Sequence, residues 1–182
     1  MRMLQIPEAV KDPVVLLVED SEPDAALMRV VFERAQYARL PHICSSGEDV
    51  ISYLCGRPPY SDRRKYPAPT AVLLDLKLPQ KSGFEVLEWI RSQPAFQHIH
   101  VYILTASRRA EDIRRAYALG ANAYLVKPSN LDDLMRMAVV LLSWLRIGQF
   151  VRDEEGRAGR KARAGALPQK TARRARKVPR RS

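Results

Sequence analysis

Several apolar runs in this sequence end in side chains that can do chemistry. Glu19 and Asp20 follow the first run, and Asp75, Thr105 and Lys127 each follow a later one. Carboxylates hold Mg²⁺, which typically uses one or two of them and keeps several waters. A lysine is a compact point charge for phosphate oxygens, and a carboxylate can form a covalent phospho-intermediate. The set therefore indicates a site for a divalent metal and a phosphoryl group, with Asp75 as the candidate nucleophile.

Each of these residues also has a plain structural explanation. The acidic pair fits the first turn of a helix, whose N-terminus favours negative charge, and Asp75 fits a turn before Pro79. Thr105 is a β-branched residue of the kind that strands favour, and Lys127 is one of many basic residues. The choice between the two explanations depends on whether one fold brings these side chains to the same place.

Between residues 14 and 146 the chain alternates strand and helix patterns. Continuous apolar runs predict strands that are buried on both faces of a parallel sheet, and apolar residues at a helical period predict the segments between them. The predicted strands cover 14–18, 41–45, 70–74, 100–104 and 123–126, and the predicted helices cover 22–36, 47–55, 83–93, 109–119 and about 130–146.

The repeated βα pattern predicts a doubly wound α/β fold, a parallel five-stranded sheet with helices on both faces. In such sheets ligands bind beyond the carboxyl ends of the strands. The acidic pair, Asp75, Thr105 and Lys127 all fall at those ends. This shared edge favours the functional explanation over the structural ones.

Local signals set the ends of several elements. Ser21 and Ser82 are suited to cap the helices that follow them, and Gly120 is suited to end the helix before it. Segment 56–69 is proline-rich, charged and long for a connection, which predicts an exposed insertion.

The basic charge of the chain is concentrated at its C-terminal end. The 182 residues carry a formal charge of +11, of which residues 151–182 carry +9 and residues 1–150 only +2. Large apolar residues almost disappear after Phe150, so that segment cannot bury enough surface to fold alone. We expect an N-terminal extension at 1–12, a globular domain at 13–148 and a basic, disordered tail at 149–182.

Targeting and cysteine signals are lacking in this sequence. The start has no apolar signal region, and no run approaches the length of a membrane span. Cys44 and Cys55 have neither metal spacing nor a disulfide framework. We therefore expect a cytoplasmic location with no membrane contact.

Four motifs, in order, resemble the receiver domains of two-component response regulators: VLLVEDS, VLLDLKLPQKSG, VYILTAS and YLVKPSN. The resemblance covers about residues 13–147. It implies a flavodoxin/CheY-like fold with strand order 2-1-3-4-5. It also implies that Asp75 accepts phosphate from a histidine kinase. Glu19, Asp20 and the backbone carbonyl of Lys77 would then hold Mg²⁺, or Mn²⁺ in its place, together with Asp75, and Lys127 would contact the phosphoryl group.

The same resemblance assigns roles around the phosphoacceptor. Thr105 matches the switch hydroxyl and Tyr124 the switch aromatic residue. The backbone amide of Ala106 would contact the phosphoryl group, and Pro128 would follow a cis peptide bond. Such a protein is a phosphoacceptor in signalling and not a metabolic enzyme, and it catalyses only its own phosphotransfer and slow dephosphorylation.

Three positions depart from the family pattern or vary within it. Glu19 stands where aspartate is commoner, and Lys77 and Ser107 occupy variable positions that tune the lifetime of the phosphate. That lifetime is therefore left open. Haloacid-type phosphatases also use a strand-end aspartate, but they need a second aspartate two residues later, where this chain has Lys77.

Three further features resemble the small regulators that partner bacterial phytochromes. They are the insertion at 56–69, the YLVKPSNLDDL segment and Trp144 in the final helix. This resemblance implies a photoreceptor histidine kinase as phosphodonor. It also implies a homodimer through the fourth helix, the fifth strand and the fifth helix.

Two further hypotheses concern other surfaces. The +9 tail is suited to bind nucleic acid without sequence preference, although a solvated tail explains the same charge and no aromatic residue follows Phe150 for base stacking. A purely scaffolding role would use Met137, Val140 and Trp144 as a contact for a partner, although core packing explains most apolar residues of that helix.

Overall fold

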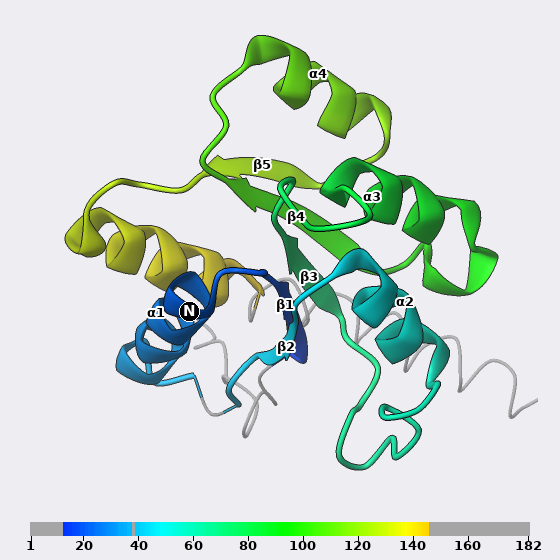
Figure 1. Ribbon diagram of the computed structural model, residues 1–182. Coiled ribbons are helices and arrows are strands. Elements are labelled where there is room, and N and C mark those ends of the chain that lie inside the picture. Colours follow the sequence, from blue (N-terminus) through cyan, green and yellow to red (C-terminus); the bar gives the residue numbers. More distant parts are fainter. Residues whose placement is uncertain (1–12, 38, 146–182) are drawn as a thin grey trace, which may run out of the picture.

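Five parallel strands form one sheet in the order β2-β1-β3-β4-β5 (Figure 1). The computed structural model describes residues 13–37 and 39–145. The predicted extension at 1–12, the basic tail at 149–182 and any nucleic-acid contact of that tail lie outside these residues. The strands are β1 (Val15–Val18), β2 (His42–Cys44), β3 (Ala71–Leu74), β4 (His100–Thr105) and β5 (Ala123–Val126). The predicted fold class and strand order are confirmed.

Helices cover both faces of this sheet, as the βα pattern predicts. Helix α1 and the helix over residues 131–145, which is drawn in yellow, lie on one face, and α2, α3 and α4 lie on the other (Figure 1). The labelled helices are α1 (Glu22–Arg34), α2 (Gly47–Cys55), α3 (Gly83–Ser92) and α4 (Ala110–Ala118), with a short 3₁₀ turn η1 (Pro94–Phe96). Each begins and ends within a few residues of its predicted bounds.

The apolar runs of β1 and β3 lie inside the sheet, where helices cover both faces. All four residues of β1 and all four of β3 are buried. Leu16 and Val18 face the layer of α2, α3 and α4, and Val15 and Leu17 face α1 and the 131–145 helix. This two-sided burial explains why the strands show continuous apolar runs and no alternation.

Side-chain caps fix the helix ends next to the sheet. The hydroxyl of Ser21 accepts a hydrogen bond from the amide of Asp24 at the start of α1. At α3, Ser82 and Glu85 form a capping box, in which each side chain accepts a hydrogen bond from the backbone amide of the other residue. Gly120 has a φ of +89° just beyond α4, as a glycine that ends a helix requires. The three predicted end signals are confirmed.

The insertion at 56–69 is mostly exposed, as predicted, but it is anchored on α2. The Arg63 guanidinium donates hydrogen bonds to the carbonyl oxygens of Tyr53 and Leu54, at 2.8 and 2.7 Å. These carbonyls lie in the last turn of α2, where helices leave carbonyl oxygens without i+4 partners, and that of Tyr53 also accepts from the amide of Gly56, at 3.1 Å. The rings of Tyr60 and Tyr66 also pack on one another and on the Tyr53 ring. The segment is therefore an ordered layer beside the sheet.

One backbone prediction is wrong. Within residues 13–37 and 39–145 the cis peptide bond is the one between Pro58 and Pro59, so the bond between Lys127 and Pro128 is trans. The two isomers of a bond before proline differ by only about 0.5–1 kcal/mol in the chain itself, and tertiary contacts decide between them.

In the same part of the chain, no helix combines the length and the apolar character that crossing a membrane would need.

Candidate functional site

Glu19 and Asp75 meet because β1 and β3 are neighbours in register. Val18 of β1 pairs with Leu74 of β3, so the next residue of each strand leaves the sheet at the same edge. The amide of Asp75 still donates to the carbonyl oxygen of Val18, at 3.1 Å. The strand order reverses at this pair, since β1 leads to β2 on one side while β3 lies on the other. Such a switch point is where doubly wound sheets bind ligands.

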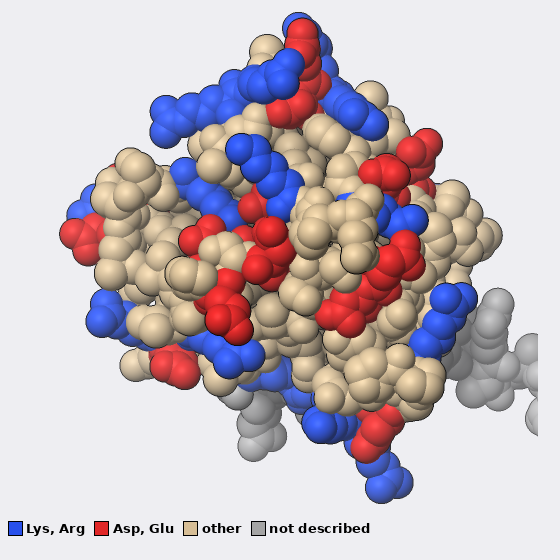
Figure 2. Space-filling view, viewed as in Figure 1, with Lys and Arg blue, Asp and Glu red and all other residues tan. Residues whose placement is uncertain are grey.

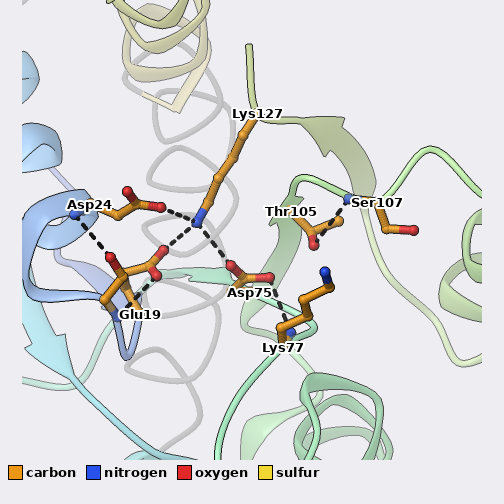
Figure 3. Close-up of polar contacts among 8 residues, drawn as sticks. Glu19, Asp24, Asp75, Lys77, Thr105, Ser107 and Lys127 are labelled. Carbon is orange, nitrogen blue, oxygen red and sulfur yellow. Dashed lines mark hydrogen bonds and ion pairs between the residues drawn. The ribbon is translucent and has the colours of Figure 1, made fainter. Parts of the chain in front are cut away.

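Lys127 reaches the same point from β5. Its amide donates to the carbonyl oxygen of Thr105, at 2.8 Å, so the backbone ladder continues beyond β5 and directs the side chain along the edge. Figure 3 shows the Lys127 ammonium between three carboxylates. Its Nζ lies 2.8 Å from Oδ2 of Asp75 and 3.0 Å from Oδ2 of Asp24, and it also forms an ion pair with Glu19.

Burial and charge act in opposite directions at this cluster. Burial raises the pKa of Glu19, and the hydrogen bond from Lys127 offsets only part of that effect. Burial alone would lower the pKa of Lys127, but its hydrogen bonds to Asp75 and Glu19 outweigh burial and raise the pKa above its usual range. The ammonium is therefore charged at neutral pH, and the cluster of three carboxylates and one ammonium carries a formal charge of −2.

Asp24 is a member of this cluster that the motifs did not single out. It lies in the first turn of α1, three residues after the cap Ser21, so its side chain lies at the helix end that faces the strand edge. An acid is favoured there by the helix dipole. The helix dipole alone would explain an acidic residue in this turn. Only the fold shows that the carboxylate of Asp24 contacts Lys127.

The loop after β3 packs closely against Asp75. The amide of Lys77 donates to Oδ1 of Asp75, at 3.1 Å, and the amide of Gly83 donates to the carbonyl oxygen of Leu76, at 3.0 Å. A Cβ on Gly83 would overlap the carbonyl oxygen of Asp75 and would lie 2.8 Å from Cα of Leu76. Glycine is required here because α3 begins in contact with the backbone of Asp75.

Thr105 and Tyr124 are both joined to the segment between β4 and α4. Thr105 is fully buried at the end of β4, and its Oγ1 lies 3.5 Å from the amide of Ser107. The Tyr124 hydroxyl donates to the carbonyl oxygen of Ser107, at 3.1 Å. Ala106, between Thr105 and Ser107, is exposed. A shift of this segment would therefore involve the residues assigned as the switch pair.

Asp20 lies beside the cluster without joining it. The residue is exposed, and its side chain lines a surface hollow next to Glu19. Within the described ranges, no three aspartate, glutamate, histidine or cysteine side chains are grouped closely enough to form a full metal site. The residues nevertheless fit Mg²⁺, because that ion uses one or two carboxylates with waters and backbone oxygens. A dication also matches the −2 charge of the cluster.

The surface around the site combines both signs of charge. Figure 2 shows acidic side chains gathered near the centre of the face where the strands end, with basic side chains bordering them. A second hollow next to Asp75 is lined by both loops that flank the site, and its lining includes Lys77, Ser82, Ser107, Arg108 and Arg109. Three of these side chains are cationic, although Asp112 also lines the hollow and Arg109 is paired with Glu111. The lining still has more cations than acids, so the approach to the site is suited to an anionic group.

Comparison with known proteins agrees with this geometry. Residues 15–139 match the family described as response regulator receiver domain. The response regulator Rcp1 of Synechocystis sp. is 37% identical over 133 residues, which are 72% of this chain and 88% of Rcp1. The structure of its Mn²⁺-bound form is similar, with a TM-score of 0.66, 36% identity and coverage of 73% of this chain and 94% of that one.

Two other solved structures are similar to a comparable degree. One is the response regulator RPA3017 in red light signalling of R. palustris, with a TM-score of 0.67, 37% identity and coverage of 71% of this chain and 90% of that one. The other is the phosphorylated cyanobacterial phytochrome response regulator RcpA, with a TM-score of 0.65, 30% identity and the same two coverages, 71% and 90%. The four motifs, the fold and these similarities agree, and the chain belongs to the response regulator receiver domain family.

Proposed function

We propose that Asp75 accepts a phosphoryl group from the phosphohistidine of a kinase. The observation that supports this most strongly is the position of Asp75, a buried carboxylate at the switch point with a lysine ammonium 2.8 Å from its Oδ2. In the reaction, a carboxylate oxygen forms a bond to phosphorus as the P–N bond breaks, and the electron pair of that bond returns to the imidazole. Asp75 is then an acyl phosphate.

The residues around Asp75 would act by position and charge, which are the main contributions of proteins to phosphoryl transfer. Lys127 would stabilise the phosphoryl oxygens, and the amide of Lys77 holds the second carboxylate oxygen in place. Glu19, Asp20, Asp75 and the Lys77 carbonyl would hold Mg²⁺, which when bound would neutralise charge that develops on those oxygens. The burial of Asp75 limits competing water.

Phosphorylation would change the segment between β4 and α4. The phosphoryl group carries a charge of about −1.5 to −2 in place of the single charge of the Asp75 carboxylate, and the Thr105 hydroxyl and the Ala106 amide can donate to its oxygens. Movement of Thr105 toward the phosphoryl group would pull on Ser107, which holds the Tyr124 hydroxyl. We infer that Tyr124 follows this segment and that the surface of α4, β5 and the 131–145 helix changes its affinity for a partner.

Phosphotransfer from a bacteriophytochrome histidine kinase tests this function. The kinase is suggested by the names of two similar proteins, one in red light signalling and one a phytochrome response regulator. A cytoplasmic encounter with the kinase is part of this proposal. We expect the labelled kinase to transfer its phosphoryl group in Mg²⁺ buffer and transfer to stop when a chelator removes the metal. Chelation should leave far-ultraviolet circular dichroism unchanged. Equal transfer with and without divalent metal would contradict the assigned role of the acidic residues.

We also propose a homodimer through α4, β5 and the 131–145 helix. Val140 and Trp144 are 69% and 55% exposed, and they border an apolar groove of about 380 Å³ with Tyr102, Leu125 and Met137.

Val140→Glu should weaken self-association about tenfold or more, since burial of a valine side chain contributes about 1.5–3 kcal/mol. Sedimentation measures the dissociation constant. Val30→Glu is the matched control, because Val30 is exposed on α1; equal effects of both changes would place the interface elsewhere.

A further inference from the structure

The three carboxylates around the Lys127 ammonium differ in their exposure to water. The side chains of Glu19 and Asp75 are 2% and 10% exposed, whereas that of Asp24 is 48% exposed. An ammonium group has three N–H donors, and here each has a carboxylate acceptor. Lys127 therefore has no donor left for another oxygen unless one of these contacts breaks.

The contact with Asp24 costs least to break. A half-exposed carboxylate regains water when its partner leaves, and pairs of this kind contribute little. Release of Glu19 would instead leave a buried charge without a partner, which is strongly unfavourable. The donor that now points at Asp75 follows the charge of that residue onto the phosphoryl oxygens, because an acyl phosphate leaves no charge on the carboxyl itself. The ammonium must shift to follow these oxygens, and the contact with Asp24 is the one that this shift breaks at least cost.

The fold holds Asp24 where the Lys127 ammonium can move between its carboxylate and a phosphoryl oxygen. Its amide is capped by the Ser21 hydroxyl, at 3.4 Å, so the residue is fixed in the first turn of α1. Figure 3 shows Asp24 and Asp75 on different sides of the ammonium. A small hollow of about 70 Å³ next to Lys127, lined by Met28, Leu104 and Asp24 among others, gives the lysine side chain room to shift.

We propose that Asp24 is a positioning residue that competes with the phosphoryl group for Lys127. It holds the ammonium in the unphosphorylated protein, and the ammonium leaves it when Asp75 is phosphorylated, which connects the state of Asp75 to the first turn of α1. The proposal rests on the proposed phosphoacceptor function. Removal of Asp24 should therefore favour the phosphorylated state.

The test compares Asp24→Asn with Glu22→Gln in the full chain. Glu22 is an exposed acid in the same first turn of α1, and it forms no ion pair with Lys127, so its change removes equal charge without the contact. The probe is beryllofluoride, a phosphoryl analogue, titrated by intrinsic fluorescence at saturating Mg²⁺. We expect its half-saturating concentration to fall about twofold to fivefold in Asp24→Asn, as loss of a competing half-exposed ion pair predicts, and to stay at the wild-type value in Glu22→Gln. Asp24→Glu, which keeps a carboxylate, should remain closer to wild type than Asp24→Asn.

A second measurement does not depend on phosphorylation. The rate at which an acylating reagent modifies the Lys127 amine in metal-free protein, followed by peptide mass spectrometry, should rise in Asp24→Asn and not in Glu22→Gln. If wild type fails to bind the analogue but this rate rises as expected, the phosphoacceptor function is wrong and the Asp24 contact is real. Equal behaviour of the two variants in both measurements, or weaker analogue binding in Asp24→Asn, would overturn the role of Asp24.

Discussion

Asp75→Asn should take up no phosphoryl group from a kinase or from acetyl phosphate. An amide oxygen is a far weaker nucleophile than a carboxylate and does not yield a stable acyl phosphate, so the loss should be complete within detection. The measurement is radiolabel retained on the chain after transfer in Mg²⁺ buffer. Asp132→Asn is a suitable control, since Asp132 is exposed on the 131–145 helix, and it should label as wild type does.

The asparagine variant should fold normally, which makes its loss of labelling interpretable. The amide is close in shape to the carboxylate, and its single oxygen can keep one of the two hydrogen bonds that Asp75 accepts, from Lys127 or from the Lys77 amide. The charge of Asp75 also raises the pKa of neighbouring Glu19, so its removal relieves a repulsion between like charges. Thermal unfolding near that of wild type, together with unchanged labelling, would assign the phosphoryl group to another residue.

Lys127→Met should slow phosphotransfer by about 10²–10³-fold, the range found when one preorganised electrostatic donor is removed from an active site. The substitution keeps much of the length of the side chain and removes the charge that would face the phosphoryl oxygens. The initial rate of labelling by acetyl phosphate measures the effect. Lys81→Met is a matched control, because Lys81 pairs with Glu48 on the surface, at 3.2 Å; equal losses in the two variants would contradict the role of Lys127.

Lys127→Met should also destabilise the protein in a pH-dependent way. It leaves Glu19 buried without its cation, and breaking such a pair costs about 3 kcal/mol. The folded-state pKa of Glu19 is already raised and should rise further, so the folded variant favours protonated Glu19. The loss in free energy of unfolding relative to wild type should thus be larger at about pH 8 than at about pH 5, where more of Glu19 is neutral. Denaturant midpoints at the two pH values measure this difference.

Features encoded by local chemistry could be predicted from the sequence. The runs at 14–18 and 70–74 mark strands because burial on both faces leaves no place for polar residues. Ser82 and Glu85 mark the start of α3 because their capping box needs only neighbouring residues. The edge where Glu19, Asp75 and Lys127 meet follows from the βα order and from the handedness of the crossovers.

Features that depend on contacts between distant residues could not be predicted in this way. Asp24 and Lys127 are 103 residues apart, and nothing near Asp24 in sequence indicates a lysine partner. Arg63 looks like any charged loop residue until its position under α2 is known. The bond before Pro128 is a different case, because its trans isomer is the one that the chain itself favours and the expectation of a cis bond came from the family resemblance.

Identification of the phosphorylated residue tests the central claim most directly. The wild-type chain, labelled in Mg²⁺ buffer and digested under conditions that preserve acyl phosphates, is mapped by mass spectrometry. We predict a single phosphoryl group, on the peptide that contains Asp75 and assigned to that residue by fragmentation. A phosphoryl group on His42, His98, His100 or any other carboxylate, with Asp75 unmodified, would contradict the assignment of Asp75 as the phosphoacceptor.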